Sequence, residues 1–280
     1  MAIDPDTLLN RDPIMVTQDW TARDTILYAL GVGAQDLDFV FEERLHALPT
    51  MAVVLGYPGF MWRNPEMGAD WTKILHGEQS IIIHKPLPVD GTFIGENRIT
   101  HLFDKGAGKG AIALVKRSIN GADGTHYADC VATTFLRGDG GFGGSSEGAP
   151  VPHPVPEDRA PDASVTLPIA DNAALIYRLL GDSNPLHIDP DVAKAGGFDR
   201  PILHGLATYG VVGRALLSAL MGNDPAKLRR MDARFSKPVF PGETIRTDIW
   251  HEGEGKAAFR ATALERDVVV MNNGYVEFAA

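Results

Sequence analysis

The stretch Leu203–Met221, LHGLATYGVVGRALLSALM, decides the fold. Apolar residues surround nearly the whole circumference of this predicted helix, which is typical of a helix buried on all sides. Gly205, Gly210 and Gly213 would let a sheet approach it closely. Four strand-like segments with partly alternating apolar residues follow: Arg230–Val239, Thr244–Trp250, Ala257–Glu265 and Val268–Phe278. The pattern predicts an α+β unit in which an antiparallel sheet wraps around one buried helix.

The first half of the chain carries a similar series of strand-like segments: Ile81–Ile83, Ile94–Leu102, Ala111–Ile119 and His126–Leu136. A turn with Gly106 and Lys109 recurs as Gly253 and Lys256, with the same spacing and with strands on both sides. This indicates one fold used twice, and chance similarity between two turns is the alternative. A further helix is predicted over Ala170–Leu180, with Asp171 as its cap.

Gly and alternating Pro dominate residues 138–161, a composition typical of a linker. We therefore expect an N-terminal unit over 1–137 and a C-terminal unit over 162–280, in agreement with the roughly two domains that 280 residues suggest. The net charge of −10 argues against nucleic-acid binding. The single cysteine, Cys130, excludes an intrachain disulfide. No secretory signal, membrane-spanning stretch or Ser-Lys-Leu ending is visible, which predicts a cytoplasmic protein without a membrane partner.

Polar residues concentrate in the stretch 177–190, YRLLGDSNPLHIDP, where a helix breaks at Gly181 and Pro185. Asp182 and His187 can converge across this broken turn, and a carboxylate–imidazole pair can take a proton from water and return one to a substrate. Asn184 lies between them and can orient the water. The alternative is that Asp182 is a turn residue and that His187 is a structural buried histidine.

A metal site is a second alternative, because His187, Asp189 and His204 are possible ligands. No compact ligand spacing such as HExxH supports it, so we expect no metal. The stretch 198–206, FDRPILHGL, predicts a helix start near Gly205. The free N–H of Gly205 could stabilise a thioester carbonyl as it becomes an enolate, although a plain helix cap would look the same.

Two stretches, GDSNPLHIDP at 181–190 and GFDRPILHGL at 197–206, resemble the signature of the MaoC-like (R)-specific enoyl-CoA hydratases. The chain is most similar to their double-hotdog kind, the hydratase domain of peroxisomal multifunctional β-oxidation enzymes. GYPGF at 56–60 and LHGEQ at 75–79 are similar to that family too. The resemblance covers nearly the whole chain and implies a double hotdog fold.

The resemblance also implies roles for individual residues. Asp182 and His187, with Asn184 beside them, would add one water syn across a trans-2-enoyl-CoA to give an (R)-3-hydroxyacyl-CoA, without a cofactor. Gly205 would hold the thioester oxygen. The remaining residues implied to contact the acyl-CoA are His76, Gly77, Lys105, Phe235 and His204.

The first half has no counterpart of the 181–187 motif, so we expect it to be catalytically silent. In the family this half has lost part of its central helix, which makes room for the acyl chain. The apolar run Met51–Trp62 would then line the acyl tunnel, or it is ordinary core. A hotdog acyl-CoA thioesterase and a non-catalytic acyl-CoA-binding subunit are alternative functions, and a homodimer is expected by analogy.

Overall fold

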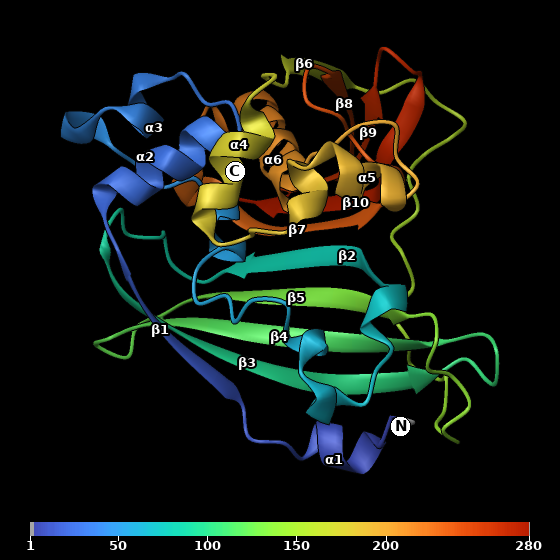
Figure 1. Cartoon of the computed structure of the whole chain (residues 1–280). Helices are drawn as coiled ribbons and strands as arrows, with labels where there is room; N and C mark the ends of the chain where they lie inside the picture. Colours follow the sequence, from blue (N-terminus) through green and yellow to red (C-terminus); the bar gives the residue numbers. More distant parts are fainter. Residues whose placement is uncertain (1–2, 280) are drawn as a thin grey trace.

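The computed structural model describes residues 3–279, whose ten strands form one antiparallel sheet (Figure 1). The strands lie in the order β1-β3-β4-β5-β2-β7-β10-β9-β8-β6. Their bounds are β1 Ile14–Trp20, β2 Ile74–Ile83, β3 Gly91–Asp104, β4 Ala111–Gly121, β5 His126–Leu136, β6 Ala163–Pro168, β7 Leu228–Phe235, β8 Thr244–His251, β9 Lys256–Ala263 and β10 Val268–Phe278. The sheet therefore runs without a break through both halves of the chain.

The two halves of this sheet have the same internal order. Read from its free edge, the first half is β1-β3-β4-β5-β2, and the second is β6-β8-β9-β10-β7. β2 and β7 join them as antiparallel neighbours, with Ile81 opposite Met231 and both side chains fully buried. This is the α+β double hotdog that the sequence predicted.

Eight of these strands were expected from the sequence, and each has a counterpart in the structure. β1 and β6, at the two edges, were missed. Apart from the buried Trp20, their residues alternate between half-buried and exposed. β6 has few large apolar side chains, and the apolar start of β1, Ile14–Val16, is followed by Thr, Gln and Asp. An edge strand buries little of its surface, so its sequence carries a weak apolar signal.

Helices pack inside the curve of the second half of the sheet, where Figure 1 shows α2, α4 and α6 together. The α-helices are α1 Pro5–Leu9, α2 Ala22–Gly31, α3 Leu37–Val40, α4 Ala173–Tyr177, α5 Pro190–Ala195 and α6 Gly205–Met221. The 3-10 turns are η1 Glu42–Arg44, η2 Pro49–Val53, η3 Met61–Arg63, η4 Pro65–Met67, η5 Trp71–Lys73, η6 Arg178–Leu180, η7 Pro185–His187 and η8 Pro225–Lys227. None of the helices within residues 3–279 has the length and apolar character needed to cross a membrane.

α6 is buried along most of its length, as predicted, but two of its glycines serve a different contact from the one expected. A Cβ at Gly210 would lie 2.4 Å from a methyl carbon of Val32, and one at Gly213 would lie 2.5 Å from the methyl carbon of Thr50. Val32 and Thr50 belong to the helical segments of the first half. Gly210 and Gly213 therefore let those segments approach α6, whereas Gly205 lies against Phe235 of the sheet, as the sequence predicted.

The predicted helix Ala170–Leu180 is present in a shorter form, as α4 followed by η6. Asp171 does not cap it. Asn172 occupies the N-cap position and makes no side-chain capping bond. The Asp171 carboxylate instead lies against Gly242, where a Cβ would meet its oxygen.

The first half lacks a long central helix, and the short turn η2 occupies the segment before β2. Met51, Ala52 and Val53 of this turn are completely or almost completely buried. The run Met51–Trp62 thus begins as ordinary core. It becomes exposed at Tyr57 and Phe60.

The Gly/Pro-rich stretch 138–161 contains no helix or strand, yet it is tied down along its length. The Asp104 carboxylate accepts hydrogen bonds from the backbone of Gly141 and Gly143, at 2.7 and 2.8 Å. Val155 is buried against Trp250. The expected flexibility of its glycines is therefore removed by specific contacts with both halves.

We predict that Gly210→Ala destabilises the protein, because its new methyl group meets Val32 and the Tyr28 hydroxyl at distances that require a shift. Overpacking costs about 1–3 kcal/mol, and replacing a helical Gly by Ala returns about 0.5–1 kcal/mol. A net loss of about 1–2 kcal/mol should lower the Tm by several degrees in a calorimetric scan. Gly31→Ala is the matched control, because its Cβ meets Tyr177 at an ordinary 3.5 Å. Equal Tm values for the two variants would contradict this packing.

Candidate active site

The loop after η6 is shaped by its own sequence. Gly181 ends the turn with a φ of 114°, which favours glycine. Asp182 Oδ1 then accepts a hydrogen bond from the backbone N–H of Asn184 at 3.2 Å. Asn184 Oδ1 accepts one from the N–H of Leu186 at 3.2 Å and so caps η7, which Pro185 begins. These turns carry Asp182 and His187 to the start of α6.

Asp182, His187 and His204 meet there, with one polar side-chain atom of each within 4.8 Å of the others. His187 Nδ1 lies 2.9 Å from the carbonyl oxygen of Ile202. A carbonyl only accepts, so Nδ1 carries the proton and Nε2 presents a lone pair. Burial lowers the pKa of His187, partly offset by the Ile202 carbonyl and the Asp182 charge. The imidazole is therefore a neutral base near pH 7.

His204 contacts both Asp182 and His187 and holds them in position. Its Nε2 donates to the backbone oxygen of Asp182 at 3.2 Å, and its ring stacks on that of His187 with centroids 3.7 Å apart. Burial, together with the neighbouring His187, lowers the pKa of His204 to about 4. His204 is thus a second neutral imidazole, which fixes the positions of both Asp182 and His187.

The metal alternative weighed from the sequence consisted of His187, Asp189 and His204. The Asp189 carboxylate instead caps α5, and Asp182 takes its place within 4.8 Å of the ligand atoms of the two histidines. The two imidazole planes are inclined by only 29° in their stack. Lone pairs of stacked rings lie in nearly parallel planes and converge poorly on one ion. Two of the four ring nitrogens already donate to backbone oxygens.

The structure also places Asn184 and Gly205 at the site. The side-chain carbonyl of Asn184 accepts the capping bond of η7, and its amide N–H₂ is free to reach a water. Gly205 is exposed at the first position of α6, which has no side-chain cap. Among the hydrogen bonds of residues 3–279, its N–H donates none. A free, accessible donor therefore stands beside His204, as an oxyanion site requires.

His76, Gly77 and Phe235 connect this cluster to the seam between the halves. The rings of His76 and Phe235 meet edge to face, with centroids 5.1 Å apart. Gly205 lies against the same Phe235 ring, since a Cβ there would be 3.5 Å from it. Burial lowers the pKa of His76 to about 4. Gly77 has no room for a side chain, because a Cβ would overlap the Phe135 ring.

Lys105 is exposed and lies near the Phe135 ring that covers Gly77. Its Nζ is 5.8 Å from the centre of the Phe135 ring, and the guanidinium carbon of Arg234 is 5.7 Å from it. A track of contacts thus runs from Lys105 through Phe135, Gly77, its chain neighbour His76, and Phe235 to Gly205. The sequence-predicted residues form one continuous series, and Arg234 adds a second cation that the sequence analysis missed.

Arg117 of the first half was also missed, and Tyr57 was noted only as part of the runs 56–60 and 51–62. Arg117 is only 7% exposed and donates to the carbonyl oxygen of Val53 at 2.6 Å, while its Nε has no partner. Within the described part of the chain, no carboxylate lies within ion-pair distance of it. Its guanidinium carbon is 5.4 Å from the centre of the Tyr57 ring. About a third of the Tyr57 side chain reaches the surface, while burial of its remainder and the Asp182 charge raise the pKa of its hydroxyl group to about 12.

Comparisons with known proteins fit this geometry. Residues 154–273 match the MaoC-like domain family, and residues 19–138 match the N-terminal domain of the MFE-2 hydratase 2 family. The chain is 43% identical to the 3-hydroxyacyl-thioester dehydratase Y of Mycobacterium tuberculosis, over all of both chains. It is 38% identical to a probable enoyl-CoA hydratase 2 of Dictyostelium discoideum, over 98% of this chain and 96% of that protein.

Among solved structures, a MaoC-like dehydratase from Phytophthora capsici superimposes with a TM-score of 0.88 and 37% identity, over 98% of each chain. Whole-length relatives of this identity share a fold and an ancestor, and both halves are matched. The chain therefore belongs to the MaoC-like dehydratase family and is a hydro-lyase.

Proposed function

We propose that the protein is an (R)-specific 2-enoyl-CoA hydratase. The observation that carries this proposal is the meeting of Asp182 and His187 beside the free N–H of Gly205. An acid/base pair and an oxyanion donor are what hydration of an alkene conjugated to a thioester needs. The names of the relatives, an enoyl-CoA hydratase and a 3-hydroxyacyl-thioester dehydratase, support this substrate class.

In this mechanism one water lies between Asp182 and His187, held in part by the Asn184 amide. The neutral His187 Nε2 takes a proton as the water oxygen bonds to C3 of the enoyl group. The electrons of the double bond move toward the thioester oxygen, where the Gly205 N–H stabilises the enolate. The pair then delivers a proton to C2. Addition is syn because both the hydroxyl group and the proton come from one side, and it gives the (R)-3-hydroxyacyl-CoA.

The track from Lys105 to Gly205 supports binding of the CoA part. Lys105 and Arg234 supply positive charge at its exposed end, where the phosphates of CoA would lie. Local charge of this kind is needed because the whole chain carries −10. The first half contributes His76, Tyr57 and Arg117 without an acid/base loop of its own.

We expect Asp182→Asn and His187→Asn each to lower kcat for hydration of crotonyl-CoA or a longer enoyl-CoA by about 10²–10⁴-fold, because each removes one partner of the proton transfer. Loss of enoyl-thioester absorbance measures the rate. Asp191→Asn and His251→Asn, both exposed, are matched controls and should keep full activity. Release of free thiol would instead support the thioesterase alternative, and full activity in either site variant would refute the assignment.

The lowered pKa of His187 sets a pH dependence. The neutral imidazole is the active form, and a lowered pKa keeps it neutral to more acidic pH. We therefore expect kcat/KM to stay constant near pH 7 and to fall only below about pH 6.5, the ordinary histidine value. A decline that already starts above pH 7 on acidification, in protein whose Tm is unchanged, would contradict His187 as the base.

Arg117 should act as an electrostatic positioning residue, since it is a buried cation beside a site that develops negative charge. We expect Arg117→Met to lower kcat/KM about tenfold, equivalent to about 1.4 kcal/mol. Its Tm should be equal or higher, because a poorly paired buried charge is removed. Arg117→Lys should recover part of the rate, and the exposed Arg98→Met is the control. A fall of Tm together with activity would instead indicate a purely structural role.

A further inference from the structure

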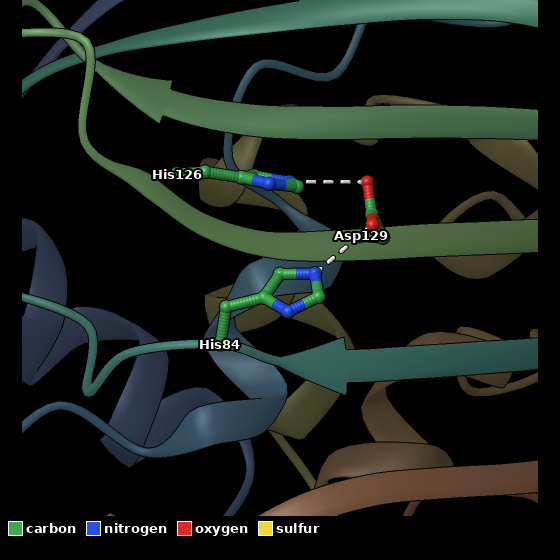
Figure 2. A group of neighbouring side chains, drawn as sticks. All are labelled: His84, His126 and Asp129. Carbon is green, nitrogen blue, oxygen red and sulfur yellow. Dashed lines mark hydrogen bonds and ion pairs between the residues drawn. The ribbon is translucent and has the colours of Figure 1, made fainter.

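We propose a second site of different chemistry: His84, His126 and Asp129 bind one divalent transition-metal ion of the Zn²⁺ class. Figure 2 shows both imidazoles directed at the Asp129 carboxylate. His84 follows β2 directly, and His126 and Asp129 lie on β5. One ligand atom from each of the three residues lies within 4.8 Å of the other two.

The group lies on the outer face of the sheet, away from the active site. Cys130, next to Asp129, points inward and reaches the carbonyl oxygen of Ala52. Successive side chains of a strand point to opposite faces, so Asp129 points outward. On β4, Arg117 likewise points inward, and its neighbours Lys116 and Ser118 share the outer face with Asp129.

The distances suit a metal centre. His84 Nε2 lies 3.0 Å from Asp129 Oδ2, and His126 Nε2 lies 3.2 Å from Oδ1. Nitrogen and oxygen ligands at about 2.0–2.2 Å from a tetrahedral Zn²⁺ are about 3.4 Å apart. The two nitrogen–oxygen separations are thus within a few tenths of an ångström of this value, and the ligand atoms of the two histidines lie within 4.8 Å of each other. Coordination would require loss of the Nε2 protons and a closer approach of the two rings around one carboxylate oxygen.

The orientation of the rings also permits it. The two imidazoles are inclined by 42° with centroids 4.4 Å apart, and both Nε2 atoms face the same carboxylate. The stacked pair of the active site, inclined by 29°, is less suited to this. Both His84 and His126 are about 40% exposed, which leaves a route for the ion and room for a water as fourth ligand.

The Asp129 carboxylate is already fixed in an orientation that suits a metal ligand. Its side chain is only 9% exposed, and Ser118 Oγ donates to Oδ1 at 2.6 Å. Outer hydrogen bonds of this kind orient a carboxylate that binds metal. Oδ2 accepts only from His84 among the hydrogen bonds of the described residues, and it therefore has a free lone pair.

Lys116 is the residue that opposes a cation, because its Nζ lies 3.1 Å from Asp129 Oδ1. Its side chain is 41% exposed and can turn into solvent. Without metal, Lys116 and the two histidines form a hydrogen-bonded hub around Asp129. If the group is a metal site, removal of the Lys116 charge should tighten binding of the ion. If the group is only this hub, removal of Lys116 can only weaken it, so a Lys116 variant provides the test.

Tag-free protein should be titrated with Zn²⁺ in competition with a chromophoric chelator, and with Co²⁺ while its visible absorption is recorded. We expect one ion per chain at this site with a Kd in the micromolar range and a rise in Tm with Zn²⁺, since a ligand of the folded state stabilises it. His84→Asn and His126→Asn should each weaken binding at least tenfold. Lys116→Met should tighten it, because it removes a repelling charge.

His153→Asn, an exposed histidine paired with Glu252, is the matched control and should bind as the wild type does. His187→Asn separates this site from the active-site cluster and should also leave binding unchanged. The proposal fails if His84→Asn and His126→Asn bind Zn²⁺ like the wild type, if His187→Asn abolishes binding, or if Lys116→Met weakens it. Unchanged Tm values of these variants without metal establish that each one folds.

Discussion

The burial of α6 between the first-half helical segments and the second-half sheet is the constraint on which the rest of the structure depends. Gly210 and Gly213 remove the side chains that would keep Val32 and Thr50 away. This close contact brings the first half of the chain against the helix whose N-terminus carries Gly205. The oxyanion donor, His204 and the loop with Asp182 are therefore positioned by packing that occurs about one helical turn or more away from them.

The same contact explains why the active site is built from both halves. Asp182 and His187 come from one short stretch, whose Gly, Asp, Asn and Pro residues encode its turns locally. His204 lies farther along the chain, directly before α6. Those residues could be predicted from the sequence because each turn depends only on near neighbours. Strand pairing and long-range packing bring Arg117, Tyr57 and Arg234 to the site. No short-range pattern in the sequence indicates that they belong to it. Their identification required the register of the sheet.

The errors in the predicted fold have the same physical origin. Strands with a buried face, such as β4 and β5, were predicted closely, while the edge strands β1 and β6 were not. The glycines of α6 were correctly associated with close approach, but sequence periodicity does not say which element approaches. Likewise, the composition of residues 138–161 predicted a flexible linker, whereas contacts such as Asp104 with Gly141 decide that it is fixed. Composition describes the freedom of the unfolded chain, and tertiary contacts determine how much of it is lost.

Residues 3–279 contain two groups of two histidines and one aspartate, and the two groups differ in burial and therefore in chemistry. In the active site, enclosure lowers the pKa values of both imidazoles and keeps them neutral, while hydrogen bonds to backbone carbonyls fix each ring in one tautomer. That state favours proton transfer, which needs one free lone pair in a defined direction. On the outer face of the sheet, both rings are partly exposed and aim at a carboxylate that Ser118 and Lys116 hold ionised. Tilted rings with accessible nitrogens around a fixed negative charge favour a cation instead. Residue type alone therefore does not determine the chemistry of a histidine cluster, because ring orientation and access to solvent decide between a base and a ligand.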